Sequence, residues 1–332
     1  MRRGMWLMTL AAACLVGFPA CESKEDSAEA DQKKSAQNDQ NQEAPAGSEE
    51  EDKPEPTSNG LVEVESTKNF EATLSGLTDA IESNDKLNLV AKVDHAADSE
   101  EAIEANTLFV FGNPNVSSPL MKEGQTAGID LPMKVVVWKD QNNAVHVALN
   151  APDYVAKRHG VESLGLFRSQ LETTLGSVIE AGTGVSVGSM PQAEEIAVEA
   201  EEGLITEESQ NSVDNTFRGF KKQIEENEDW SIVLEVNHTD NAEKVGRTIS
   251  PTRLLMLKNT KMTTPLVAGK QSLGLEFPVR LLIYETKKAE ILVSYDDPEY
   301  LAERHGLDGQ QERLDTLSRA LEKMVAIGIE EK

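Results

Sequence analysis

Hydrophobic residues follow the same succession of spacings in two separate parts of the chain. From residue 70 to 81 they recur at the spacing of one helical face, and from 87 to 93 they alternate with polar residues as in a half-buried strand. The same helical spacing returns from 213 to 224, and the same alternation returns from 230 to 236. The pattern therefore predicts an internal duplication, with a helix followed by a strand near the start of each copy.

Shorter patterns predict the remainder of each copy. An apolar strand comes next, then a hairpin, then a short helix that a proline starts and a glycine ends, and finally a longer amphipathic helix. We therefore predict an α+β protein with two repeated β-α-β4-α domains, each a mostly antiparallel sheet with helices packed on one face. The later strands fall at 107–111, 134–139 and 144–149 in the first copy and at 253–257, 279–285 and 290–295 in the second, and the closing helices lie around 171–179 and 317–325.

One strand of each copy is apolar at every position. Residues 135–138 read Val-Val-Val-Trp, and residues 281–284 read Leu-Leu-Ile-Tyr. A one-sided antiparallel sheet would alternate apolar and polar residues instead, so we expect the second face of each sheet to be covered. Our hypothesis is that the two copies pack against each other as an intrachain pseudo-dimer.

Short polar motifs recur in the same order in both copies. The first copy carries Val93-Asp94-His95-Ala96, Phe111-Gly112-Asn113-Pro114, Asp130-Leu131-Pro132, and Tyr154 followed by Arg158-His159-Gly160. These motifs resemble the family known as domain of unknown function number 302. The resemblance implies a β-α-β4-α fold and no established activity. The second copy departs from the motifs, with Asn237 in place of the aspartate and with Lys258 and Thr260 around Asn259.

The start of the chain is typical of an exported bacterial protein. Two arginines precede an apolar stretch that is too short to span a membrane, and Ala20-Cys21 is followed by a polar run. This pattern resembles a lipoprotein cleavage site, with Cys21 as the residue that takes the lipid; an ordinary secretory signal is the alternative. The predicted boundaries are residues 1–21 for the signal peptide, 22–59 for a disordered acidic tether, 60–182 for the first domain, 183–202 for a linker and 203–328 for the second domain.

The composition excludes several classes of partner and site. The formal net charge is −26, and a surface this acidic repels nucleic acid. Both cysteines lie in the leader region, so lipidation of Cys21 leaves no thiol for zinc binding or redox chemistry. No Walker loop, nucleophile elbow or zinc-protease motif is present, and we predict no cofactor.

His95 and Asp94 lie at the end of a predicted strand. Strict alternation places His95 on the face that carries Leu89 and Val93, turned toward the helices, and Asp94 on the opposite face. His95 is a weak candidate for a metal or ligand site, and His238 is its counterpart in the second copy. The alternative interpretation, which we favour, is a histidine at the edge of the core that is hydrogen-bonded to a loop backbone.

Three further residues complete the set of ligand-binding candidates. Asn113 and Asn259 each follow a strand, where an asparagine either caps a turn or contributes to a binding loop. Asp130 precedes Leu131-Pro132 and is either a turn cap or a carboxylate ligand. The interpretation we favour for His159, just before a glycine, is that of a cationic side chain at a helix end.

The leading functional hypothesis is a membrane-tethered envelope lipoprotein that acts as a binding or interaction module and is not an enzyme. Its partners would be the membrane, through the lipid anchor, and a protein or small ligand. The residue after Cys21 is Glu22 rather than aspartate, which favours the outer membrane, facing the periplasm or the surface. The alternative is an enzyme that depends on a metal or a small ligand, with its site in the first copy around His95, Asn113 and Asp130.

Overall fold

The alternating segments form strands, and the segments with helical spacing form helices. The computed structural model describes residues 58–97, 103–162 and 164–330. Asn69 and Ser212 begin the first helix of each repeat, because their side chains accept hydrogen bonds from the backbone N–H groups of Ala72 and Asn215. The first repeat contains β1 (Leu61–Glu65), α1 (Phe70–Glu82), β2 (Asn88–Asp94), β3 (Asn106–Gly112), α2 (Pro114–Glu123), the 3₁₀ helix η1 (Gln125–Ile129), β4 (Met133–Lys139), β5 (Val145–Asn150), α3 (Pro152–Arg158) and α4 (Leu166–Thr183).

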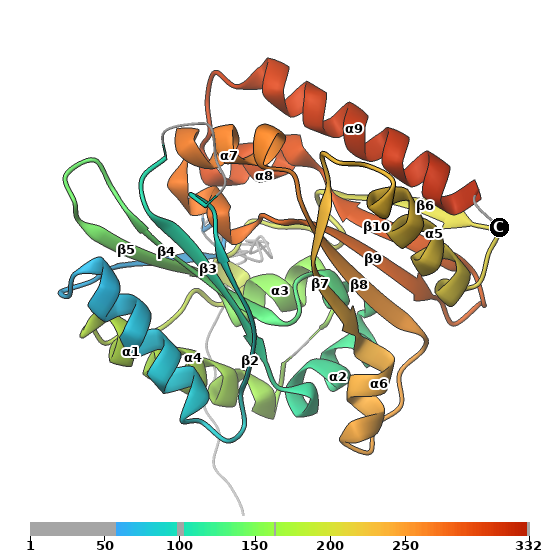
Figure 1. Cartoon of the computed structure of the whole chain (residues 1–332). Helices are drawn as coiled ribbons and strands as arrows, with labels where there is room; N and C mark the ends of the chain where they lie inside the picture. The colour runs from blue at the N-terminus through green and yellow to red at the C-terminus, as the bar shows by residue number, and fades with distance from the viewer. Residues whose placement is uncertain (1–57, 98–102, 163, 331–332) are drawn as a thin grey trace, which may run out of the picture. The chain divides into compact units, whose positions relative to one another are not determined.

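Among the described residues, the second repeat contains the same elements as the first and, in addition, helix α6. A 3₁₀ turn, η2 (Ala193–Glu195), lies between the repeats, and α6 follows directly after the second strand of the second repeat (Figure 1). The second repeat contains β6 (Leu204–Ser209), α5 (Val213–Glu225), β7 (Ser231–Asn237), α6 (His238–Lys244), β8 (Thr252–Lys258), α7 (Thr260–Gly269), η3 (Gln271–Leu275), β9 (Val279–Glu285), β10 (Ile291–Asp296), α8 (Pro298–His305) and α9 (Gln311–Glu330).

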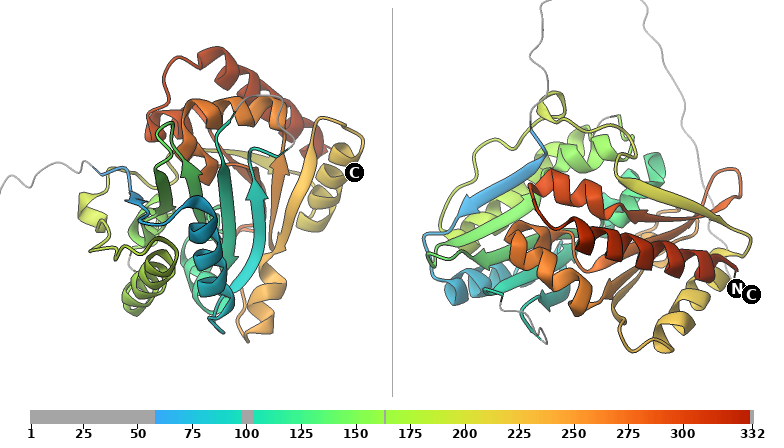
Figure 2. Two further views of the ribbon diagram at one scale, coloured as in Figure 1. Left: turned by 60° about the vertical axis from the view of Figure 1, so that its left-hand side comes forward. Right: turned by 90° about the horizontal axis from the view of Figure 1, so that it is seen from above.

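Each repeat builds one antiparallel sheet of five strands. The strand order is β1-β5-β4-β3-β2 in the first repeat and β6-β10-β9-β8-β7 in the second. Helices α1 and α4 pack together over one face of the first sheet, and α5 and α9 do the same over the second (Figures 1 and 2). The predicted α+β class, with two repeated antiparallel sheets and their helices, is therefore confirmed.

The face of each sheet away from its helices contacts the other repeat. One buried apolar cluster contains Val136 and Trp138 of the first sheet together with Leu282 and Tyr284 of the second. The 3₁₀ helices take part as well, because η1 of the first repeat packs on β9 and η3 of the second packs on β4. Strands that are apolar on both faces are thus explained, since one face meets helices and the other meets the partner repeat.

A bulge in the second strand of each repeat makes the predicted orientation of His95 wrong. The pairing of β2 with β3 shifts between Leu89 and Ala91, so strict alternation fails at Val90. Leu89 packs with the helices, whereas Val93 belongs to the cluster between the repeats. His95 comes two residues after Val93 and therefore lies on the same side, where its Nε2 is 2.9 Å from the Gly274 carbonyl oxygen of the second repeat. The same shift occurs in β7, between residues 232 and 234.

The two repeats also exchange segments across their boundary. Ala242 in α6 and Ile249 in the loop after it are buried in the core of the first repeat. In return, Ile103, in the corresponding loop of the first repeat, packs on the core of the second. Each helix-side core is therefore completed by a residue of the other repeat.

Three parts of the chain differ from the sequence pattern. Residues 114–123, for which we predicted no element, form helix α2, with Asn113 as its cap and Pro114 in its first turn. The predicted linker 183–202 packs Met190, Ile196 and Val198 on the first core. The end of the predicted tether is bound rather than disordered, because the Asn59 side chain donates to the Arg304 carbonyl at 2.9 Å. Cys21 and the rest of the leader and tether up to residue 57 lie outside the described residues.

Candidate functional site

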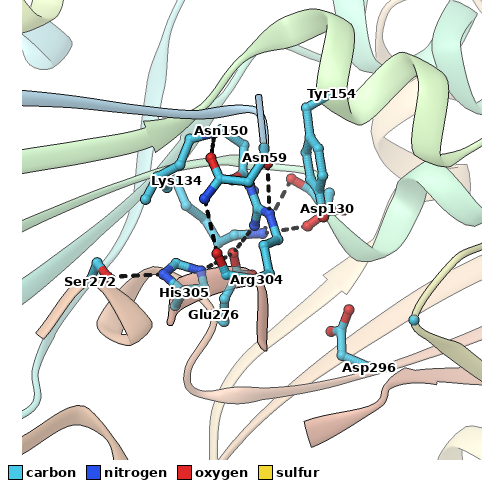
Figure 3. Close-up of polar contacts among 12 residues, drawn as sticks. Asn59, Asp130, Lys134, Asn150, Tyr154, Ser272, Glu276, Asp296, Arg304 and His305 are labelled. Carbon is cyan, nitrogen blue, oxygen red and sulfur yellow. Dashed lines mark hydrogen bonds and ion pairs between the residues drawn. The ribbon is translucent and has the colours of Figure 1, made fainter. Parts of the chain in front are cut away.

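Asp130 and Glu276 lie at the centre of a buried group of charged side chains between the repeats. Each residue ends a 3₁₀ helix, η1 or η3, which places its carboxylate beneath the facing sheets. Asp130 accepts from Lys134 at 3.1 Å, from Arg158 at 3.0 Å and from Arg280 at 2.6 Å. Figure 3 shows Asp130, Lys134 and Glu276 among the polar side chains that meet here. We call this group the axial cluster; it contains Asp130, Lys134, Arg158, His159, Glu276, Arg280, Asp296, Arg304 and His305.

The axial cluster is built from pairs of equivalent positions in the two repeats. Arg158 pairs with Asp296 of the second repeat at 2.8 Å, and the equivalent Arg304 donates to Asn150 of the first at 2.7 Å. Lys134 and Arg280 are likewise equivalent, but only Arg280 reaches carboxylates of both repeats.

Two tyrosines meet beside the axial cluster. The hydroxyl oxygens of Tyr154 and Tyr300 lie 3.1 Å apart. An arginine guanidinium of the other repeat lies over each tyrosine ring. Cζ of Arg304 is 3.8 Å from the centroid of the Tyr154 ring, and Cζ of Arg158 is 5.3 Å from that of the Tyr300 ring. The contacts across the boundary are therefore reciprocal.

The axial cluster is buried, and its charged groups shift one another's pKa values. The side chains of Asp130, Arg158 and Arg280 are each 1% exposed. Burial raises the pKa of Asp130, but Lys134, Arg280 and Arg158 outweigh it and hold that pKa well below its usual range. The pKa of Glu276 is also held well below its usual range, because Arg280, His305 and Arg304 outweigh the effect of burial. Nε of Arg280 has no hydrogen-bond partner among the described residues, but the other buried polar atoms of these side chains have partners, and we therefore interpret the axial cluster as a structural joint between the repeats.

His159 belongs to this joint and is not merely a cation at a helix end. Its Nδ1 lies 3.0 Å from the Thr126 hydroxyl, and its Nε2 lies 2.9 Å from an Asp130 oxygen. Burial lowers the pKa of His159, although the bond to Asp130 opposes that shift. His305 makes the equivalent contacts with Ser272 and Glu276.

His95 and His238 each bind the backbone of the opposite repeat. Nε2 of His95 lies 2.9 Å from the Gly274 carbonyl oxygen, and Nε2 of His238 lies 3.0 Å from the Gly128 carbonyl oxygen. Burial is the largest effect on both and lowers each pKa to about 4. The histidines are therefore neutral near pH 7 and donate to these carbonyls. The favoured interpretation expected a bond to a loop backbone, but the acceptor carbonyl belongs in each case to a 3₁₀ helix of the other repeat, η3 for His95 and η1 for His238.

The four polar candidates of the first repeat do not share one site. Asp94 caps a turn by accepting from the N–H groups of Ala96 and Ala97. His95 binds Gly274, Asn113 caps α2 and Asp130 belongs to the axial cluster. In the described ranges no hydrogen bond or ion pair joins any two of them. Within the same ranges, no group of three or more histidine, cysteine, aspartate or glutamate side chains is placed to hold a metal ion.

Asn113 does, however, line a large cavity. The cavity has a volume of about 770 Å³, which lies within the usual range of small-molecule sites. Its floor is apolar and contains Phe111, Leu120 and Leu175, each less than 5% exposed. Val90, at the bulge of β2, also lines it and leaves 40% of its surface exposed. A cavity with a buried apolar floor fits the apolar part of a ligand.

The second repeat supplies one wall of this cavity. The residues that line it include Val236 and Asn237 at the end of β7, and His238, Asn241 and Lys244 in α6. Helix α6 packs on α2 of the first repeat and so holds this wall in place. The interval from His238 to Asn259, which contains α6, is three residues longer than that from His95 to Asn113 (21 against 18). One repeat alone therefore does not enclose the cavity.

The equivalent region of the second repeat is more tightly packed. Helix α7 packs on the closing helix α9, whereas α2 packs on α6. Leu171 in α4 lines the cavity and is half-buried, while its equivalent in α9, Leu317, is fully buried. The first repeat thus keeps space between its helices where the second repeat fills it.

Comparisons with known proteins identify the family of both repeats. The family model described as domain of unknown function DUF302 matches residues 62–182 and again residues 205–324. The chain belongs to the DUF302 family. The resemblance predicted from the short motifs is therefore confirmed for both copies. A DUF302 protein from Bacillus stearothermophilus, whose crystal structure is known, is 14% identical with a TM-score of 0.32 and covers 39% of this chain and 97% of its own.

Some relatives of this DUF302 chain carry a functional name. A protein from Brucella suis named fluoride-specific ion channel FluC 1 is 36% identical over 110 residues, which cover 32% of this chain and 42% of the relative. A protein from Brucella melitensis named fluoride-specific ion channel FluC 2 matches at the same identity over 39% of its length. The chain thus spans less than half of each of these relatives. In the described part of this chain, no helix has both the length and the apolar character needed to cross a membrane.

Sequence reasoning missed the residues that make the joint and the cavity wall. Arg158 belonged to a motif but was given no role there, and Arg280 and Asp296 carried no motif. Each of the three has a partner more than 100 residues away: the separation is 138 residues for Arg158 with Asp296 and 150 for Arg280 with Asp130. The recurrence of an arginine before each His-Gly pair was the available signal. Asn237 was recorded only as a departure from the aspartate motif.

Proposed function

We propose that the protein is a membrane-tethered binding module whose cavity in the first repeat takes a small, mostly apolar molecule. The observation that carries the proposal is the cavity of about 770 Å³, with its buried apolar floor and a rim rich in side-chain amides. The axial cluster and the exchanged segments support this function, because they hold α6 over the cavity. Catalysis is not part of the proposal, since His95, Asn113 and Asp130 have separate partners.

Membrane attachment rests on the leader and the tether. The pattern around Cys21 supports a lipid anchor of the outer membrane that faces the periplasm or the surface, and the acidic tether supports a binding unit held away from the bilayer. Similarity to part of a protein named as an ion channel is consistent with a location at a membrane. Changing Cys21→Ser should move the protein from the membrane fraction to the soluble fraction and abolish palmitate labelling. Unchanged fractionation would count against the anchor.

Binding is tested with Nile red, an uncharged dye that fluoresces in apolar surroundings. The full chain carrying Cys21→Ser is used, so that neither acyl chains nor detergent take up the dye. We expect saturable binding that Leu171→Trp weakens at least about tenfold, because the indole fills space between α4 and α2. The matched control is Ile327→Trp, which adds the same ring to an apolar position that is 42% exposed on α9.

The outcomes separate clearly. Saturable binding that is lost in Leu171→Trp and kept in Ile327→Trp supports the cavity as the site. Equal binding by all three proteins, or no saturable binding by the parent chain, would overturn the proposal. Melting temperatures of the three proteins show whether the added rings have disturbed the fold.

A further inference from the structure

Two asparagines, one from each repeat, bring side-chain amides to the cavity. Asn113 directly follows β3 and caps α2, and its Oδ1 accepts from the Asn115 N–H at 2.9 Å. Asn237 ends β7 and caps α6, and its Oδ1 accepts from the Asp240 N–H at 3.1 Å. Within the described residues, neither Nδ2 donates a hydrogen bond to the protein. Each capping asparagine therefore has an N–H donor to spare where the cavity is lined.

Capping alone does not explain an asparagine at this position. A helix cap needs only an acceptor, and aspartate supplies it equally well. Asn259, the equivalent of Asn113 in the second repeat, caps α7 through Oδ1, and its buried Nδ2 has no partner among the described residues. An unused buried donor costs free energy. Both repeats thus keep an amide donor that the cap does not use, and in the first repeat that residue lines the cavity.

The cavity offers little to an anion. Pro114 has no N–H, and the next three N–H groups of α2 are already bound: that of Asn115 by the Asn113 side chain, and those of Val116 and Ser117 by the Asn113 carbonyl. The start of α2 is therefore not free to bind a carboxylate or phosphate. The charged residues of the rim are also mostly acidic, with three carboxylates (Asp85, Glu235, Asp240) against two lysines (Lys86, Lys244).

A cation is not favoured either. Asp85, Glu235 and Asp240 are exposed and therefore solvated at the rim, while the floor is apolar. A charged group carried onto that floor would lose its hydration without gaining an ionic partner. The matching ligand is one whose buried part is uncharged.

We propose that the cavity binds an uncharged, mostly apolar molecule with a carbonyl group, and that the carbonyl oxygen accepts a hydrogen bond from Nδ2 of Asn113. Asn113 is the better placed donor, because it follows Phe111 and Gly112 directly along the cavity lining. Asn237 is a second donor on the opposite wall. This inference rests on the proposed function and adds the chemical class of the ligand.

The test compares three probes that carry unbranched alkyl chains of similar length and differ in their head group. The neutral ketone 2-dodecanone, the anion dodecanoate and the cation dodecyltrimethylammonium each displace Nile red from the full chain carrying Cys21→Ser. We expect the ketone to bind at least about tenfold more tightly than either ion, since only the ketone keeps its hydrogen bond without burying a charge.

The matched variants are Asn113→Asp and Asn69→Asp. Asn113→Asp keeps the acceptor that caps α2, so its melting temperature should stay close to that of the parent, but it replaces the spare donor with a carboxylate. Affinity for the ketone should fall about tenfold, and affinity for the ammonium probe should rise. Asn69→Asp makes the same change at the exposed cap of α1, outside the cavity lining, and should leave the ketone affinity within about twofold.

The results distinguish the carbonyl ligand from the more general claim that the cavity binds an apolar molecule. Equal or tighter binding of dodecanoate or the ammonium probe, or no loss of ketone affinity in Asn113→Asp, would overturn the carbonyl ligand. The proposed function would still stand in that case, because Leu171→Trp would continue to abolish dye binding. Absence of saturable dye binding by the parent chain would defeat both.

Discussion

Replacing Asp130 with asparagine removes the carboxylate with the most partners in the axial cluster. Asp130 accepts from Lys134, Arg158, His159 and Arg280 at distances between 2.6 and 3.1 Å. Asparagine has the same shape, but one of its two terminal groups is a donor and would face other donors. Four basic side chains of the cluster would then share two carboxylates instead of three.

We expect Asp130→Asn to lower the free energy of unfolding by about 3–5 kcal/mol, the usual cost of breaking a buried ion pair from one side. The same chemical change at Asp94 is the matched control. Asp94 is exposed, and its capping oxygen is retained by asparagine, so the change there should stay within about 0.5 kcal/mol. Both variants lose one negative charge, so the difference between their free energies of unfolding reports the effect of burial and of the ionic partners of Asp130.

The assay is urea unfolding of the full chain, followed by circular dichroism at several pH values. The folded-state pKa of Asp130 lies well below that of the unfolded chain, so its stabilising effect is complete above about pH 4 and is lost as the pH falls through the folded-state pKa. The parent chain should therefore lose more stability than Asp130→Asn below about pH 4. A variant as stable as Asp94→Asn at pH 7 would refute the role of the axial cluster as a joint.

Two further predictions concern the contacts between the repeats. Burial lowers the folded-state pKa of His95 to about 4, so as the pH falls from about 6.5 to 4 the unfolded chain takes up the proton first and the parent protein loses up to about 3 kcal/mol of stability. His95→Gln should reduce this loss, as measured by urea unfolding across that pH range. Gly128→Ala should lower the free energy of unfolding by about 1–3 kcal/mol, because the added Cβ would lie 2.9 Å from Leu282 Cδ1 of the other repeat. Gly176→Ala in helix α4 is the control: its Cβ meets nothing within 4 Å, and it should raise the free energy of unfolding by about 0.5–1 kcal/mol. Equal effects at the two glycines would contradict the close packing at Gly128.

The fold was predictable because its signals are local. Helical spacing, strand alternation and the caps Asn69 and Ser212 are all visible within a few residues of sequence. The orientation of His95 was not predictable, because a bulge at Val90 leaves no mark in the alternation of apolar residues. One extra residue in the strand reverses the face of every residue after it.

For the cavity, the sequence allowed single candidate residues to be predicted, but not which residues come together. Asn113 was identified as a candidate from its place after a strand, and it does line the cavity. Its partners on the opposite wall come from α6, more than 120 residues later (Asn237 minus Asn113 is 124). No local pattern reports that α6 packs on α2, since this contact depends on how the two sheets face each other.

The most direct test of the cavity as a carbonyl-binding site is a crystal structure of the chain with 12-bromododecan-2-one. The account predicts anomalous bromine density inside the cavity floored by Phe111 and Leu175, with the carbonyl oxygen within hydrogen-bonding distance of Asn113 Nδ2. Bromine bound only outside that cavity, or a carbonyl turned away from both Asn113 and Asn237, would contradict it.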